Sequence, residues 1–216
     1  TAKIIKDEED HGIGALFVDA GTEGLNLGEP ENKMGWKGSD TRSVFFDNME
    51  ISSNNILGNP EKGFNQFLQT LTGGRITIAA LALGISQGAY NAALHYSKER
   101  EAFGKKINKF QAISFKLADM ATQIEASKHL VYNAAWLKDQ NKKIIKEAAM
   151  AKLFSSEVAM SITTEAIQIH GGFGYIREYN VERFFRDAKI LEIGEGTSEV
   201  QRIVISREIL KSLKDQ

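Results

Sequence analysis

Cysteine is absent from this sequence of 216 residues, and proline and histidine are scarce. Without cysteine the chain has no disulfide, no thiolate nucleophile and no cysteine-bound metal, which fits a reducing compartment. The 4 histidines are scattered, and no two have the helical spacing of metal ligands, so we expect no metal site. Only 2 prolines and no low-complexity run argue against long linkers.

A strong net charge and long apolar runs are also missing. The net charge of −1 gives no reason to expect nucleic acid as a partner. No uninterrupted apolar stretch approaches the length of a membrane helix, so we expect no membrane span. The charge is uneven, because residues 1–57 carry 11 acidic and 5 basic residues and the rest carries 17 acidic and 22 basic residues. A phosphate-bearing ligand therefore suits the later part of the chain.

The first 57 residues have the pattern of β-structure. We expect a strand over residues 13–18, a turn over 21–24, and a second strand over 42–51 with Val44, Phe45 and Phe46 at its centre. Such a piece is too small to form a closed sheet. Its missing strands are expected from sequence upstream of Thr1.

From Gly63 onward the apolar residues follow the helical period. Five helices are expected, over residues 64–101, 111–138, 142–169, 181–188 and 199–213. Short connections between long helices favour an antiparallel bundle. The sequence therefore predicts a mainly α protein, with part of an antiparallel β-domain in residues 1–58 and an up-down helical bundle in residues 59–216.

Glu195 lies between two glycines, Gly194 and Gly196, immediately before a predicted helix. Ser198 and Gln201 form a Ser-x-x-Gln pattern typical of a capping box, which predicts the start of that helix. Glycines on both sides of one acid indicate a sharp turn or a closely approaching ligand, so Glu195 is a candidate general base. The alternative is a plain connection between helices with a solvated acid.

Two further segments are candidates for binding a cofactor. Arg100, Phe103 and Gln111 lie in a segment that could hold a pyrophosphate by charged hydrogen bonds with a ring against Phe103; a basic helix end is the alternative. The Gly-rich run at residues 171–174 follows a helix rather than a strand, so it is no Rossmann motif, and by itself it is more typical of a helix cap with a tight turn than of a binding site.

A pair of glycines, Gly73 and Gly74, precedes Arg75 inside the first long helix. Two glycines in a helix cost roughly 1 kcal/mol each relative to alanine, so close packing or an approaching ligand is expected there. His170 is a lone histidine at a helix end, where a cap or a packed side chain is the usual role, and we assign it no catalytic function.

Together these segments resemble the acyl-CoA dehydrogenases, flavoproteins that form a trans-2,3 double bond in acyl-CoA thioesters. Residues 193–202, Ile-Gly-Glu-Gly-Thr-Ser-Glu-Val-Gln-Arg, are similar to the signature of that family. Residues 33–46 look like the second half of its middle β-domain and residues 64–216 like its C-terminal helical domain. Residues 111–120 and 146–153 are most similar to the short-chain members.

The resemblance implies a role for each candidate residue. Glu195 would be the base that removes the α-proton, with Arg75 supporting it. Some members carry their base at the position of Gly74 instead, so Glu195 is the only base in a family position. The implied cofactor contacts are Arg100, Phe103, Gln111, Gln168, Gly171, Gly172 and Thr197.

The implied activity is FAD-dependent α,β-dehydrogenation of a short or branched-chain acyl-CoA, with electrons passed to an electron-transfer flavoprotein. A homotetramer built as a dimer of dimers is implied, in the cytoplasm of a bacterium or the mitochondrial matrix of a eukaryote. Two residues depart from the family, Thr72 in place of an Asp and Gly194 in place of a Tyr. Rival interpretations are an oxidase of the same fold and a helical bundle that binds without chemistry.

Overall fold

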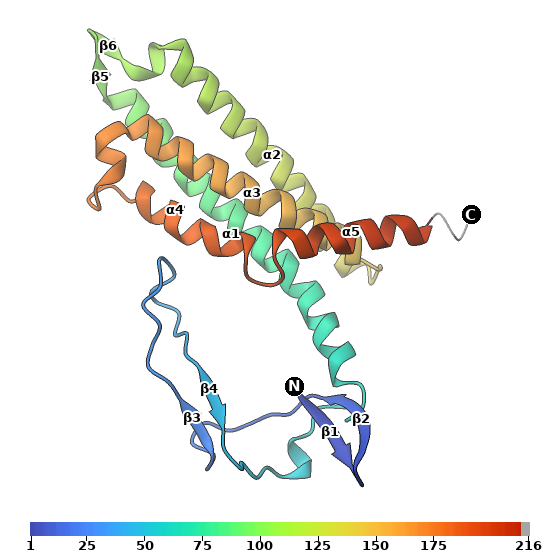
Figure 1. The fold of residues 1–216 in the computed structure, drawn as a ribbon. Helices are drawn as coiled ribbons and strands as arrows, with labels where there is room; N and C mark the ends of the chain where they lie inside the picture. Colours follow the sequence, from blue (N-terminus) through green and yellow to red (C-terminus); the bar gives the residue numbers. More distant parts are fainter. Residues whose placement is uncertain (213–216) are drawn as a thin grey trace. The chain divides into compact units, whose positions relative to one another are not determined.

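The structure is a computed structural model that describes residues 1–212, coloured along the chain in Figure 1. The chain forms two compact units, Thr1–Leu71 and the part from Thr72 onward, which divide inside one long helix. The predicted end of the last helix at residue 213 lies outside the described residues.

The first unit contains two small antiparallel pairs of strands. Strand β1 (Ala2–Lys6) pairs with β2 (Glu9–Gly14), and β3 (Leu25–Leu27) pairs with β4 (Val44–Phe46). A short 3-10 helix, η1 (Ser53–Asn55), follows. This unit is the β-part that the sequence predicted, although its strands differ from the predicted ones.

The predicted strand bounds are wrong in three places. The chain over residues 13–18 leaves β2 at Gly14 and then forms an isolated bridge between Leu16 and Ile56. The strand predicted over 42–51 shrinks to β4. The β1–β2 hairpin was missed because its strands are largely exposed and polar, and because its turn uses left-handed Asp7 and Glu8 instead of an Asn-Gly signal.

Five α-helices confirm the predicted mainly α class. They are α1 (Gly63–Glu99), α2 (Gln111–Asp139), α3 (Ile145–His170), α4 (Val181–Lys189) and α5 (Ser198–Ser212). Between α1 and α2 lies a small hairpin of β5 (Glu101–Ala102) and β6 (Lys105–Lys106), followed by the 3-10 helix η2 (Ile107–Lys109). Figure 1 shows α1, α2 and α3 running alongside one another, with α4 and α5 packed against α3.

Small side chains allow the three long helices to approach closely. Ala89 and Ala93 of α1 and Ala166 of α3 are fully buried in one apolar cluster that also takes Met120 from α2. A second cluster includes Ala79 of α1 and side chains of α2 and α3. Close packing at these alanines sets the spacing of the bundle, so the buried alanines in the sequence of α1 have a packing role.

Among the helices that the structure describes, α1 alone is long and apolar enough by composition to cross a membrane. The expectation concerned uninterrupted apolar stretches, and polar residues such as Thr77, Ser86 and Gln87 interrupt the apolar part of α1. Core helices of soluble bundles pass the same test, and the buried alanines of α1 face the other helices. Only 28% of the apolar window is buried, so this chain leaves much of it uncovered. The expected absence of a membrane span stays a prediction.

Replacing Ile162, which is fully buried in α3, tests the first apolar cluster. We expect Ile162→Ala to lower the free energy of unfolding by about 2–5 kcal/mol, because it removes buried methyl groups and leaves a cavity. Ile203→Ala on α5 is the control, since Ile203 is 56% exposed. Denaturant unfolding followed by helical circular dichroism measures both, and equal losses would contradict the assigned core.

Candidate active site

A strained turn carries Glu195. The 3-10 helix η4 (Ile190–Glu192) ends where the Gly194 N–H donates a 2.7 Å hydrogen bond to the Ile190 carbonyl. Glu195 then takes a left-handed φ of 56°, and Gly196 a φ of 88°. A glutamate rarely adopts this conformation and does so at an energetic cost, so the surrounding structure must hold it there.

Helix α5 begins one residue earlier than the predicted cap allows. The Thr197 hydroxyl accepts a 3.4 Å hydrogen bond from the Val200 N–H, which makes Thr197 the N-cap. The predicted capping box with Ser198 as the cap is therefore wrong. The Ser198 hydroxyl is buried and has no hydrogen-bond partner among the described residues. The Gln201 amide points to the Glu195 turn instead of back to the cap.

Two buried side chains, one on α3 and one on α5, hold the turn by hydrogen bonds. Gln201 of α5 donates hydrogen bonds to the carbonyl oxygens of Gly196, at 2.8 Å, and of Glu195, at 3.3 Å. Lys152 of α3 donates a 2.8 Å hydrogen bond to the same Gly196 carbonyl. Both side chains are fully buried. Sequence reasoning missed Lys152, because a single lysine in an amphipathic helix has no pattern that distinguishes it from a solvated one.

The Glu195 carboxylate lies against α1 at Gly74. A Cβ added to Gly74 would come within 2.8 Å of the Glu195 Oε2 atom, so only a glycine leaves room for the carboxylate there. A Cβ added to Gly73 would meet the amine of Lys138 at 3.0 Å, a less close contact than the one at Gly74. Of the two explanations predicted for the glycine pair, close packing therefore applies to Gly74.

Arg75 supplies a buried positive charge beside this carboxylate. Its side chain is only 7% exposed, and its Nε atom has no hydrogen-bond partner among the residues described. Burial lowers the pKa of the Arg75 guanidinium, and the charge of Glu195 opposes that shift. Arginine nevertheless stays protonated in proteins. An unpaired buried donor next to an exposed carboxylate is an arrangement suited to a polar ligand.

A second group of predicted residues lies around a cavity of about 520 Å³ at the other end of α3. Arg100, Gly171 and Gly172 line it together. Gly171 has a left-handed φ of 59°, and no atom lies within 4 Å of a Cβ built on either glycine. A guanidinium beside backbone that faces open space fits the phosphate groups of a dinucleotide cofactor.

Phe103, Gln111 and Gln168 do not line this cavity. Phe103 lies between β5 and β6 in a left-handed conformation and is 95% exposed. Its ring meets Phe110 edge-on, with 6.2 Å between ring centres. Gln111, the first residue of α2, and Gln168, in the last turn of α3, are both exposed. These side chains are free to contact a ligand or subunit outside this chain.

His170 is a packed side chain, in agreement with the role expected for it. Its Nδ1 atom lies 2.7 Å from the Ala166 carbonyl oxygen, and its ring stacks on Tyr96. Burial lowers the pKa of His170, and the hydrogen bond to Ala166 opposes the shift. In residues 1–212 no group of three or more His, Asp or Glu side chains could hold a metal ion.

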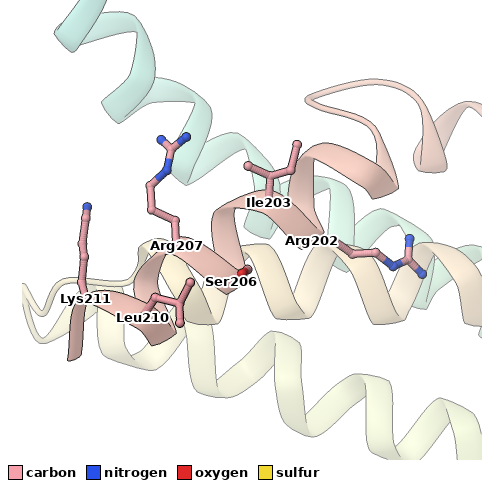
Figure 2. Close-up of a pocket in the computed structure, with 6 residues that line it drawn as sticks. All are labelled: Arg202, Ile203, Ser206, Arg207, Leu210 and Lys211. Atoms are coloured by element: carbon pink, nitrogen blue, oxygen red, sulfur yellow. The ribbon is translucent and has the colours of Figure 1, made fainter. Parts of the chain in front are cut away.

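A further cavity, of about 610 Å³, lies on α5 and contains none of the predicted site residues. Figure 2 shows its lining, in which Ile203 and Leu210 lie among Arg202, Arg207 and Lys211. Arg202 pairs with Glu157 of α3, and Lys211 pairs with Glu208. All six lining residues come from this one helix, so the cavity is an open groove along its surface.

A family model and several known proteins match this chain. The sequence model of the acyl-CoA dehydrogenase C-terminal domain matches residues 61–210. A probable acyl-CoA dehydrogenase of Bacillus subtilis is 56% identical over 92% of this chain and 52% of its own length. A caffeyl-CoA reductase–Etf complex subunit of Acetobacterium woodii is 47% identical over 97% of this chain and 55% of its own.

Among solved structures, butyryl-CoA dehydrogenase from Megasphaera elsdenii superposes with a TM-score of 0.92 and 49% identity. The superposition covers 97% of this chain and 55% of that one. The chain thus spans about half the length of the curated relatives it matches.

The two glycines beside Glu195 should respond differently to substitution. Gly196→Ala forces an alanine into a left-handed φ and brings its Cβ within 2.8 Å of the Gln201 amide, so we expect a loss of about 1–2 kcal/mol in unfolding free energy. Gly194→Ala meets only the Ile190 carbonyl at 3.4 Å and should be nearly neutral. Thermal unfolding compares them, and equal effects would argue against the turn described here.

Proposed function

The chain belongs to the acyl-CoA dehydrogenase family, and from that membership we propose that its protein removes hydrogen from the α- and β-carbons of a short or branched-chain acyl-CoA thioester. The observation that carries this proposal is the Glu195 carboxylate held against Gly74 beside buried Arg75. Glu195 acts as the base. The domain assignment of residues 1–58 to a partial middle β-domain and 59–216 to the helical bundle is part of the same proposal.

Glu195 removes the proton from the α-carbon of the thioester. That proton is too weakly acidic for a free carboxylate, so negative charge must be stabilised as it develops on the thioester carbonyl oxygen. We assign the backbone N–H of Glu195 to that oxygen. Arg75 fixes a positive charge beside the carboxylate, and its unpaired Nε atom is available to hold it in place.

FAD is the proposed cofactor. Arg100, Gly171 and Gly172 around the smaller cavity would bind its phosphates, with Phe103, Gln111, Gln168 and Thr197 as further contacts. When bound, the flavin supplies the acceptor for the hydride that leaves the β-carbon. The 95% exposure of Phe103 supports a role for this side chain in the cofactor site of a neighbouring subunit.

The proposed partners are an electron-transfer flavoprotein and further copies of the chain. The name of the Acetobacterium relative, a subunit of a reductase–Etf complex, supports the first. Exposed apolar side chains support the second, because a single chain leaves them uncovered. They lie on α2 and α5 and include Phe115, Tyr132, Trp136, Ile203 and Leu210. The reducing compartment proposed is the cytoplasm of a bacterium or the mitochondrial matrix of a eukaryote.

The proposed substrate range follows from Gly194. A Cβ at this position would have its nearest neighbour at 3.4 Å, so a side chain is sterically possible and glycine leaves that volume open. The open volume beside the base admits a branched or longer acyl group. Thr72 lacks the charge of the aspartate usual in the family and so weakens the hold on the pantetheine arm.

Replacing the base is the direct test of the proposed function. Glu195→Gln keeps the size of the side chain but cannot accept the proton, so in the flavin-loaded enzyme kcat should fall by at least about 10²-fold. Acyl-CoA binding, measured by the change in the flavin spectrum, should survive. Turnover is followed anaerobically with a dye acceptor, and in air as peroxide, which separates a dehydrogenase from an oxidase.

Glu199→Gln is the matched control, because Glu199 is an exposed glutamate in the first turn of α5. Its turnover should stay within about twofold of the parent enzyme. If Glu195→Gln retains more than a tenth of the parent kcat, another residue is the base.

Phe103→Ala tests the cofactor contact between subunits. Because Phe103 is almost fully exposed in one chain, its removal should leave the unfolding of the bundle unchanged while flavin dissociates faster. Sedimentation should give a dimer or a tetramer for the holoenzyme. A monomer with stoichiometric flavin, or undiminished flavin retention by the variant, would contradict the contact.

A further inference from the structure

Lys152 lies near the middle of α3 with its side chain fully buried. Lysines are almost never fully buried without a partner, because removing an ammonium from water is unfavourable. Small buried residues lie on the same side of the helix, among them Ala148, Ala149 and Ser156. The one hydrogen bond found for its Nζ atom is that to the Gly196 carbonyl.

The bonded carbonyl belongs to the turn that carries Glu195. Glu195 itself has a left-handed φ of 56°, a conformation that an unrestrained glutamate would leave for the right-handed region. A change in this φ rotates the chain that follows Glu195 relative to the chain that precedes it, so it would carry the Gly196 carbonyl away from Lys152 and Gln201. The two donors, one on α3 and one on α5, therefore oppose the relaxation.

The charges around Lys152 favour an ammonium at this place. Burial lowers the pKa of Lys152, and Glu192 is the strongest opposing influence, followed by weaker effects of Glu195 and Glu199. Arg75 acts in the same direction as burial. Three glutamates thus support a charge on the Lys152 amine against burial and Arg75, and a charged donor makes a stronger hydrogen bond than a neutral one.

We propose that Lys152 is a positioning residue for the base: its buried ammonium holds the Gly196 carbonyl, keeps the Glu195 turn left-handed, and so keeps the Glu195 carboxylate against Gly74. This inference rests on the proposed function, since it assigns to Lys152 the orientation of the group that removes the α-proton. Lys152 acts through the turn, because its Nζ atom bonds to the Gly196 carbonyl.

The test replaces Lys152 in the flavin-loaded enzyme. Lys152→Met keeps an unbranched side chain of similar length without the donor. Misplacement of a reacting group by about 1 Å costs up to about 10²-fold in rate, so kcat should fall about 10- to 100-fold while the KM for acyl-CoA and the flavin content stay within about twofold. Lys146→Met, a partly exposed lysine of the same helix that pairs with Glu147, is the control and should leave kcat unchanged.

Proton exchange separates positioning from a general loss of structure. A 3-thia acyl-CoA thioester can give up its α-proton but has no β-hydride to lose, so in D₂O the base exchanges α-hydrogen for deuterium without any electron transfer. The rate per bound flavin should fall in Lys152→Met by the same factor as kcat. A lysine that merely fills the core would lower the amount of folded enzyme and leave this rate per site unchanged.

Glu195→Gln distinguishes failure of this inference from failure of the proposed function. Exchange that persists in Glu195→Gln refutes the base itself. Exchange abolished in Glu195→Gln but within twofold of the parent in Lys152→Met refutes only the role of Lys152. If Lys152→Met does not assemble, Lys152→Gln, which retains a shorter neutral donor, takes its place with the same expected loss. Failure of both variants to fold would overturn the proposal, because the ammonium would then serve the core rather than the turn.

Discussion

The carbonyl oxygen of Gly196 accepts hydrogen bonds from two fully buried side chains, Lys152 and Gln201, and the candidate site depends on this double contact. It fixes a turn that the sequence alone would not keep, since Glu195 is neither glycine nor asparagine. The turn directs the carboxylate against α1. Close packing between helices makes the arrangement possible, because small residues on α3 let a lysine reach from one helix to the loop before another.

The two groups of site residues lie far apart along α3. Lys152 marks one of them and His170, beside the Gly-rich run, marks the other; 18 residues of helix correspond to about 27 Å at 1.5 Å per residue. The distance fits the proposal that Arg100 and Phe103 serve a cofactor whose reactive end belongs to another subunit, and it explains why one chain shows a carboxylate and a phosphate-type cavity without a common pocket.

Most of the helical fold could be predicted from the sequence, because its long amphipathic helices repeat the same apolar period many times. The starts of α2 at Gln111 and α4 at Val181 agree with the predicted ones. The β-part was harder, since its strands are three to six residues long and mostly exposed, and burial therefore leaves little alternation to detect. The cap of α5 was misassigned because Thr197 and Ser198 are both good caps, and only the position of the Gln201 side chain decides between them.

The candidate site divided in the same way. Local patterns and the family resemblance pointed to Glu195, Arg75 and the glycines. A resemblance of this kind identifies residues but says nothing of the side chains that surround them. Lys152 could not, because its role depends on a hydrogen bond across 44 residues of sequence. A buried polar contact of this kind depends on packing in three dimensions, and the residues next to Lys152 in the sequence do not predict it.

The contact between Gly74 and the Glu195 carboxylate also restricts how the sequence can diverge. The space beside Gly74 accommodates one carboxylate and no Cβ, so any side chain gained at position 74 must be matched by retreat of the side chain at position 195. The two positions, about 120 residues apart, are therefore sterically coupled, and the effect of a substitution at one depends on the residue at the other.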